Sequence, residues 1–294
     1  MRIIDIMKGH KPSFSLEFFP PKSEEEIAQL YQTLGRVRCL NPAFVSITYG
    51  AGGGTRDRTL RIVEHAKSKV GLEAAAHITC VRHSKAEIKQ VLDQLVRSGI
   101  ENVVALRGDP PKGEAHFVPN PSGFRHASEL TAFIHESYPL CIAVAGYPEG
   151  HTESPDKETD WDHLEEKVEA GADLIITQLF FENRYFFEFE RHMRERGVSI
   201  PIIPGIMPIT NFQQIQPITK MCGASLPDKL AADLDAIQHE PELVQRYGIE
   251  FATKQCRELL DHGVPGIHFY TLNKSRATQE IIWSLRRKRL TEVN

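Results

Sequence analysis

The chain has 294 residues, of which 41% are hydrophobic and 25% are charged, and it contains no low-complexity tract. This composition excludes a disordered, collagen-like or coiled-coil protein, and the length is typical of one large α/β domain. Lys and Arg number 35 against 39 Asp and Glu, so the formal net charge is -4. A nucleic-acid-binding protein would carry a basic surface, so we expect a small-molecule partner instead.

Other protein classes are excluded by short-range patterns. No segment approaches the roughly 20 apolar residues of a membrane span, and Asp5 interrupts the apolar start of the chain, so we expect a cytoplasmic protein without membrane association. The five cysteines are scattered and form no Cys-x-x-Cys pair, which indicates buried, reduced thiols. The 13 histidines show no metal-ligand spacing, so we expect no metal site.

Short apolar runs, typical of buried parallel strands, alternate with longer segments of helical period. The runs begin roughly every 30 residues, which is the spacing of repeated β-α units. We expect strands at 14–19, 44–48, 73–79, 103–106, 141–146, 174–178, 200–203 and 267–269. Because both faces of such strands must be covered, the pattern favours a closed (β/α)₈ TIM barrel over an open sheet, with residues 1–294 in a single domain.

Helix start and stop signals lie between these runs. The start signals are Ser23 with Glu26, Ser84 with Glu87, and Thr159-Asp160 before Trp161. Glycines typical of helix ends are Gly71, Gly99, Gly171 and Gly197. The Pro- and Gly-rich segment 107–123 predicts a long loop. The long last interval predicts an insertion around 225–249, which we interpret as a solvated extension rather than a lid.

In a TIM barrel the chemistry lies where the strands end, so polar residues at the eight exits are the candidate site. These residues are Glu17, Thr48 with Tyr49, His77 with Thr79, Arg107-Gly108-Asp109, Tyr147 with Glu149 and His151, Gln178, the predicted Pro204-Gly205 turn, and Tyr270 with Thr271 and Asn273.

Glu17 interrupts the most apolar strand, between Leu16 and Phe18. Such a carboxyl is either paired with a Lys or Arg across the barrel mouth or poised as an acid. Desolvation by its aromatic neighbours would favour the neutral acid, which can donate a proton near neutral pH.

Charged residues also mark the fourth exit and one helix. Arg107-Gly108-Asp109 places a cation and an anion beside a glycine, either for close approach to a ligand or as a local salt bridge. Asp160 and Lys167 are two helical turns apart, about 10 Å along one face. They could contact one ligand or belong to an ordinary charged face.

The segment Gly50-Ala51-Gly52-Gly53-Gly54-Thr55 is rich in glycine but matches neither a Rossmann fingerprint nor a P-loop. Pattern alone leaves two interpretations of this segment open, a flexible turn and a ligand contact.

Longer strings at the strand ends match a known family from about residue 13 to 285. They are Ser15-Leu16-Glu17-Phe18-Phe19-Pro20-Pro21-Lys22, Ser46-Ile47-Thr48-Tyr49-Gly50-Ala51, Ala105-Leu106-Arg107-Gly108-Asp109-Pro110, Gly146-Tyr147-Pro148-Glu149, Ile176-Thr177-Gln178-Leu179-Phe180-Phe181, Pro204-Gly205-Ile206-Met207-Pro208 and His268-Phe269-Tyr270-Thr271-Leu272-Asn273. In these strings the chain resembles methylenetetrahydrofolate reductases, in the short bacterial form with a single catalytic domain.

The resemblance implies a flavoprotein of one-carbon metabolism. It would pass a hydride from NAD(P)H to FAD and then to 5,10-methylenetetrahydrofolate, giving 5-methyltetrahydrofolate by a ping-pong relay. Glu17 would be the general acid that opens the imidazolidine ring, and Asp109 would hold the pterin and stabilise the resulting cation. We also expect a homo-oligomer, because members of this family usually associate.

The resemblance also assigns binding roles. The residues implied for FAD are Thr48, His77, Arg107, Gly108, Asp109, Tyr147, His151, Asp160 and Lys167. Those implied for the substrate are Glu17, Asp109, Gln178, Gln214, Tyr270 and Lys274, with Lys274 standing where bacterial relatives carry Arg. A wide pocket lined by Phe180, Phe181 and Tyr270 is expected, because aromatic side chains stack on the flat rings of both ligands.

Two other functions are alternatives to this one. One is a flavin-free pterin-binding barrel that presents a methyl group to a corrinoid partner. The other is a catalytically silent barrel that serves as an interaction module. A yellow colour from bound flavin would exclude the first, and the acid at Glu17 argues against the second.

Overall fold

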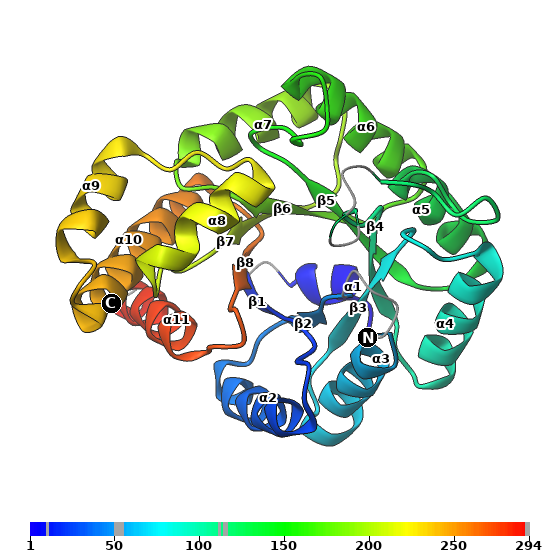
Figure 1. Cartoon of the computed structure of the whole chain (residues 1–294), viewed down its shortest axis with the longest axis horizontal. Coiled ribbons are helices and arrows are strands. Elements are labelled where there is room, and N and C mark those ends of the chain that lie inside the picture. The colour runs from blue at the N-terminus through cyan, green and yellow to red at the C-terminus, as the bar shows by residue number, and fades with distance from the viewer. Residues whose placement is uncertain (10–11, 50–55, 111–112, 114–116, 292–294) are drawn as a thin grey trace.

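The computed structural model describes residues 1–9, 12–49, 56–110, 113 and 117–291. Within these residues, eight parallel strands pair in chain order, and the last pairs back with the first to close a barrel (Figure 1). The strands are β1 (Ser13–Phe18), β2 (Phe44–Ile47), β3 (Ala74–Thr79), β4 (Asn102–Leu106), β5 (Cys141–Gly146), β6 (Leu174–Leu179), β7 (Ile202–Ile206) and β8 (Gly266–Tyr270). The predicted (β/α)₈ barrel is confirmed.

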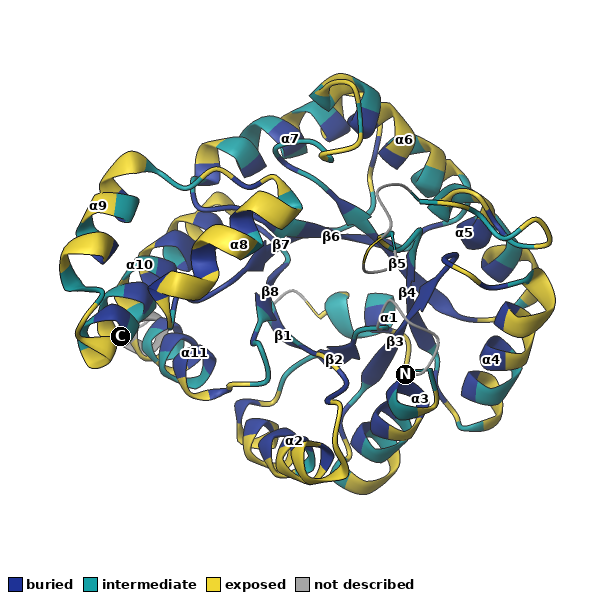
Figure 2. Cartoon of the chain, in the orientation of Figure 1, coloured by how far each residue is buried: buried dark blue, intermediate teal, exposed yellow. Residues whose placement is uncertain are grey.

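Helices surround the barrel, with their exposed faces turned outward and their buried faces toward the strands (Figure 2). They are α2 (Glu24–Val37), α3 (Arg56–His65), α4 (Lys85–Arg97), α5 (Ala127–Ser137), α6 (Lys157–Glu169), α7 (Asn183–Glu195), α8 (Phe212–Cys222), α9 (Asp228–Ile237), α10 (Pro241–His262) and α11 (Arg276–Thr291). A short 3₁₀ turn (Arg38–Leu40) and a π turn (Ala66–Val70) extend α2 and α3.

Alternation along the strands separates two apolar layers. One set of side chains packs between the strands and the outer helices, as Val45 and Ile175 do. The alternate set fills the barrel interior, as Phe44, Val104 and Ile203 do. Residues one step further toward the strand ends on this inner face are the ones that can reach a site at the barrel mouth.

Local start and stop signals account for most helix boundaries. Ser23 and Ser84 both form complete capping boxes, as predicted. The predicted start of α6 at Thr159 is wrong, because Asp156 is the cap. Its side chain accepts a hydrogen bond from the Thr159 backbone N–H at 2.7 Å, so the helix begins two residues before Thr159.

The predicted turn at Pro204-Gly205 is also wrong, because both residues lie inside β7. The Gly205 N–H donates to the Thr177 hydroxyl at 2.9 Å, next to a register shift between β6 and β7. A Cβ on Gly205 would lie 2.6 Å from the Tyr270 ring. Glycine is therefore required here by close packing.

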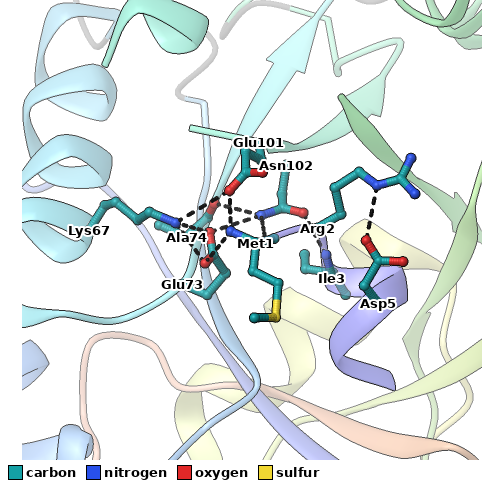
Figure 3. Close-up of polar contacts among 9 residues, drawn as sticks. All are labelled: Met1, Arg2, Ile3, Asp5, Lys67, Glu73, Ala74, Glu101 and Asn102. Atoms are coloured by element: carbon teal, nitrogen blue, oxygen red, sulfur yellow. Dashed lines mark hydrogen bonds and ion pairs between the residues drawn. The ribbon is translucent and has the colours of Figure 1, made fainter. Parts of the chain in front are cut away.

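The N-terminal segment packs at the amino end of the barrel, and Figure 3 shows its polar contacts with residues at the starts of β3 and β4. Helix α1 (Ile3–Met7) places Ile3 in the interior core, and the Ile3 N–H donates to the Asn102 side chain at 2.7 Å. Lys67 binds the Glu73 carboxylate beside them at 2.6 Å. The amino end is thus filled by packing and polar contacts, which leaves the carboxyl end for a ligand.

Helix α9 and the first turns of α10 occupy residues 225–249, where an insertion is predicted. They pack over α8 through an apolar cluster that includes Phe212, Leu230 and Val244. None of the residues 225–249 lines the cavity described below.

Candidate active site

A cavity of about 910 Å³ lies at the carboxyl end of the barrel. This volume is at the upper end of the range for small-molecule sites. The structure brings most of the predicted site residues into its wall: Glu17, Thr48, His77, Arg107, Gly108, Asp109, Tyr147, His151, Asp160, Lys167, Gln178 and Tyr270. They come from the four strands β1, β3, β6 and β8, the loops after β2, β4 and β5, and helix α6.

Glu17 lies at the floor of the cavity, with its side chain 18% exposed. Its Oε2 atom is 3.2 Å from Nε2 of His77 and 3.5 Å from Nε2 of His268, and the Ser46 hydroxyl donates to it at 3.4 Å. Within the described part of the chain, these two histidines are the basic groups in ion-pair range. The alternative of a Lys or Arg partner is therefore not what the structure shows.

The expected neutral state of Glu17 is wrong for this geometry. Burial alone would raise the pKa of the carboxyl, but the charge of His77 and hydrogen bonds from His268 and His77 outweigh it and lower the pKa to about 2. Phe18, next to Glu17 in sequence, does not set its environment, because side chains alternate along the strand and its ring packs between the barrel and the helices. Glu17 is a carboxylate at neutral pH in this structure.

The tripeptide Arg107-Gly108-Asp109 after β4 lets the backbone approach a ligand closely. Arg107 pairs with Glu153 at 2.7 Å and stacks over the Phe117 ring at 5.0 Å, so its ion-pair partner among the described residues is not Asp109. Gly108 has φ of +87°, and a Cβ there would lie 3.0 Å from Val81. A glycine is required at this point of the wall.

Helix α6 carries the predicted charged pair into the cavity. Lys167 is partly buried, its ammonium donates to the Ala145 carbonyl at 2.6 Å, and desolvation lowers its pKa to about 8. Burial raises the pKa of Asp160, which the positive charge of Lys167 partly offsets. Burial also lowers the pKa of His151, as does the charge of Arg107. The two helix residues therefore do not form an ordinary solvated face.

Three features of the wall fit a phosphate-bearing cofactor with flat rings. The Thr79 hydroxyl is buried without a hydrogen-bond partner in the described structure. The N-terminus of α5, at His126, Ala127 and Ser128, lines the cavity and has no side-chain cap, so its free N–H groups suit an anion. Lys167 adds a partly buried cation. The predicted FAD-binding residues thus form a wall of suitable chemistry.

Two predicted substrate residues lie away from this wall. Gln214 on α8 and Lys274 after β8 are exposed and do not line the cavity, so their roles stay predictions. Phe180 and Phe181, expected to line the pocket, are buried in the packing between barrel and helices instead. Strand β6 ends at Leu179, and the chain turns outward immediately after it.

Sequence reasoning missed Phe19, Leu179, Met207 and Met221 on the apolar side of the cavity. Phe19, Leu179, Met207, Ile218 and Met221 line it, and Phe19 is 43% exposed and Met221 72%. The Phe18-Phe19 string was the available signal, since alternation buries only one of the two rings. Met221 from α8 carries no signal, because a single helix face gives no hint of which strand it covers.

Other predictions concern regions outside the cavity. The glycine-rich segment 50–55 lies outside the described residues. Among the described residues, no group of three His, Cys, Asp or Glu could hold a metal ion, and no helix has the length and apolarity that crossing a membrane requires. Buried thiols are found at Cys80, Cys141 and Cys256, whereas Cys39 is exposed.

The fold and cavity define the class of the molecule: a (β/α)₈ barrel with a ligand site at the carboxyl ends of its strands. Solved structures with this fold include a dihydropteroate synthetase (TM-score 0.51, 14% identity, 95% of this chain and 94% of that one). Another is a dihydrodipicolinate synthase from Agrobacterium tumefaciens (TM-score 0.53, 11% identity, 97% and 80%). At these identities the likeness shows the fold alone.

Sequence comparison gives the family. A family model described as methylenetetrahydrofolate reductase matches residues 2–286, and the chain belongs to this family. It is 38% identical over 300 residues to "Methylenetetrahydrofolate reductase (NADH) 1" of Arabidopsis thaliana, covering 97% of this chain and 51% of that protein. It is 35% identical to the "5,10-methylenetetrahydrofolate reductase" of Pectobacterium carotovorum subsp. carotovorum, covering 92% and 89%. The chain thus spans about half the length of the plant relative.

Proposed function

We propose that this protein reduces 5,10-methylenetetrahydrofolate to 5-methyltetrahydrofolate with electrons from a reduced nicotinamide nucleotide, through bound FAD. The observation that carries the proposal is a carboxyl group, Glu17, at the floor of a cavity of about 910 Å³, in a chain of this family. The name of the plant relative specifies NADH, which makes NADH the first donor to test.

The flavin would occupy the polar side of the cavity. Arg107, Lys167 and the N-terminus of α5 supply positive charge for its phosphates, and Gly108 lets the backbone approach its rings. Bound there, FAD would supply the hydride chemistry that links the nicotinamide to the folate. The apolar side formed by Phe19, Leu179 and Met207 excludes water from the ring that reacts.

Glu17 would act on the folate from below. Its carboxyl donates a proton to the nitrogen that leaves the one-carbon unit, which opens the imidazolidine ring. Asp109, at the cavity rim, stabilises the cation that results, because a carboxylate fixed near developing positive charge lowers its energy. Gln178 adds an amide to the cavity wall, suited to hydrogen bonds with a pterin ring.

The tyrosine at the end of β8 has a different task. The Tyr270 hydroxyl donates to the Thr177 carbonyl at 2.6 Å, and burial raises its pKa well above the ordinary value. Tyr270 therefore supplies a fixed aromatic wall and no proton. A homo-oligomer in the cytoplasm, working in one-carbon metabolism, remains part of the proposal.

Anaerobic stopped-flow spectroscopy tests the proposal. The purified protein is reconstituted with FAD, mixed with NADH or NADPH, and the reduced protein is then mixed with methylenetetrahydrofolate. We expect bleaching of the flavin absorbance near ~450 nm in the first mix and its return in the second. A protein that retains no flavin, or one whose reduced flavin is not reoxidised by the folate, would contradict it. The first result would favour a flavin-free pterin-binding barrel.

A further inference from the structure

Two polar side chains lie inside the barrel beneath Glu17, in an interior that is otherwise mostly apolar. Ser15 on β1 and His268 on β8 are paired in the strand register and are 2% and 0% exposed. The Phe44 ring stacks on the imidazole, with 5.7 Å between ring centroids. TIM barrels fill this region with branched apolar side chains, and burying polar groups costs free energy unless they are hydrogen-bonded. The pair therefore calls for a role besides packing.

His268 connects the buried pair to Glu17. Its Nδ1 lies 2.8 Å from the Ser15 hydroxyl oxygen, and its Nε2 lies 3.5 Å from Oε2 of Glu17. Two other titratable groups face this point: His77 at 3.2 Å from the same carboxylate oxygen, and the Tyr270 ring, whose edge packs on the imidazole. Contacts at both nitrogens fix the orientation of the His268 ring.

The proposed reaction needs a proton that Glu17 does not hold in this structure. The charge and hydrogen bonds of His77 and His268 lower its pKa to about 2, so Glu17 is a carboxylate at pH 7. A ligand lying over Glu17 would also block direct supply from water. The proton has to come from a group that touches the carboxylate from within the protein.

We propose that His268 is a positioning residue that holds the proton which Glu17 delivers to the folate. This inference rests on the proposed function. In the open cavity the proton is on Nε2 of His268, and the imidazolium pairs with the carboxylate. Covering Glu17 with flat ligand rings removes water, and low polarity favours a neutral pair over an ion pair. The proton then moves from Nε2 to Oε2.

The proton balance closes over one turnover. Glu17 passes the proton to the leaving nitrogen of the folate and becomes a carboxylate again, while His268 is left neutral. When the product departs, the cavity reopens to water and one solvent proton restores the imidazolium. The Nδ1–H bond to the Ser15 oxygen is kept in both states, so the ring does not have to turn.

His268 is better placed for this task than His77. His77 lies in the cavity wall, where the cofactor is expected to contact it, and ligand binding would change its surroundings. His268 is completely buried below the cavity and does not line it. Its proton is therefore available to Glu17 alone.

The test compares wild-type protein with His268→Gln and Ser15→Ala. The pKa of Glu17 is measured in the ligand-free protein by NMR of ¹³C-labelled glutamate carboxyls, with Glu17→Gln assigning the signal. We expect His268→Gln to raise this pKa from about 2 toward its ordinary value, and Ser15→Ala to raise it less. An unchanged pKa in both variants would overturn the inference, and Ser15→Ala decides it if His268→Gln does not fold.

Half-reaction kinetics of the FAD-loaded protein give the second readout. We expect His268→Gln to slow reoxidation by methylenetetrahydrofolate about 10²-fold and to change its pH profile, because general-acid catalysis contributes on this order. Flavin reduction by NADH should stay within about twofold, whereas a merely structural role would slow both steps. A wild-type pH profile in the variant would refute the role of His268 alone. A wild-type protein that never reduces the folate would refute the proposed function.

Discussion

Replacing Glu17 by Gln is the substitution with the clearest consequences. The amide has the shape of the carboxyl but no proton to give, so it separates acid catalysis from packing. The fall in pKa from 4.5 to about 2 corresponds to about 3 kcal/mol in favour of the charged form, which the variant can no longer gain from His77 and His268. We expect reoxidation by the folate to slow by about 10²-fold to 10⁴-fold and flavin reduction by NADH to persist.

The same substitution has a signature in stability. A depressed pKa stabilises the fold above the unfolded-state pKa, and this contribution is lost as the pH falls through the folded-state value. Urea denaturation should therefore show Glu17→Gln less stable than wild type at pH 7, by up to about 3 kcal/mol, with the difference shrinking from about pH 4.5 toward pH 2. The amide still accepts hydrogen bonds, so the upper figure is a bound.

Glu149→Gln is the matched control. Glu149 also follows a strand, but it accepts hydrogen bonds from the Ser225 backbone N–H and does not line the cavity. It should leave both half-reactions near wild type. Equal loss of both half-reactions in Glu17→Gln, or loss of neither, would refute the reasoning about the acid.

Three further substitutions test other parts of the site. Gly108→Ala forces a side chain onto φ +87° and against Val81, so we expect a loss of about 1–3 kcal/mol in thermal unfolding and a lower flavin-to-protein ratio; an unchanged melting curve would contradict this. Lys167→Met removes an ammonium group whose pKa is lowered to about 8 in the folded protein. Between about pH 8 and 10.5 only the unfolded chain still binds the Lys167 proton, so the stability of wild type should rise relative to that of the variant over this range. Parallel pH profiles of the two proteins in denaturation would contradict this expectation. Tyr270→Phe loses one hydrogen bond to Thr177 and should cost about 0.5–1.5 kcal/mol, with folate reduction slowed less than tenfold; a loss of 10²-fold or more would make Tyr270 a proton donor.

The barrel could be predicted because its strands are nearly continuous apolar runs at regular spacing. Signals of this kind are local, and both capping boxes were predicted for the same reason. Errors arose where distant packing decides the outcome. Pro204 and Gly205 have the composition of a turn, yet contacts with β6 and β8 hold them in a strand.

The sequence predicted which residues lie at the cavity better than it predicted the charge state of Glu17. Glu17 and Lys167 could be placed near a cavity from their positions at a strand end and on a helix face. The partners that set the state of Glu17 are His77 and His268, the latter 251 residues away in the chain, and no spacing rule connects either of them with Glu17. The prediction that Phe180 lines the pocket was wrong for a related reason. The end of β6 decides whether the Phe180 ring faces the cavity or the helices.

A crystal structure of the FAD-loaded protein with a bound folate would show whether Glu17 faces the substrate. We expect the isoalloxazine in the cavity at the carboxyl end of the barrel, with the Glu17 carboxyl within about 2.6–3.2 Å of the nitrogen that leaves the one-carbon unit. A flavin bound elsewhere, or a folate held away from Glu17, would contradict this expectation.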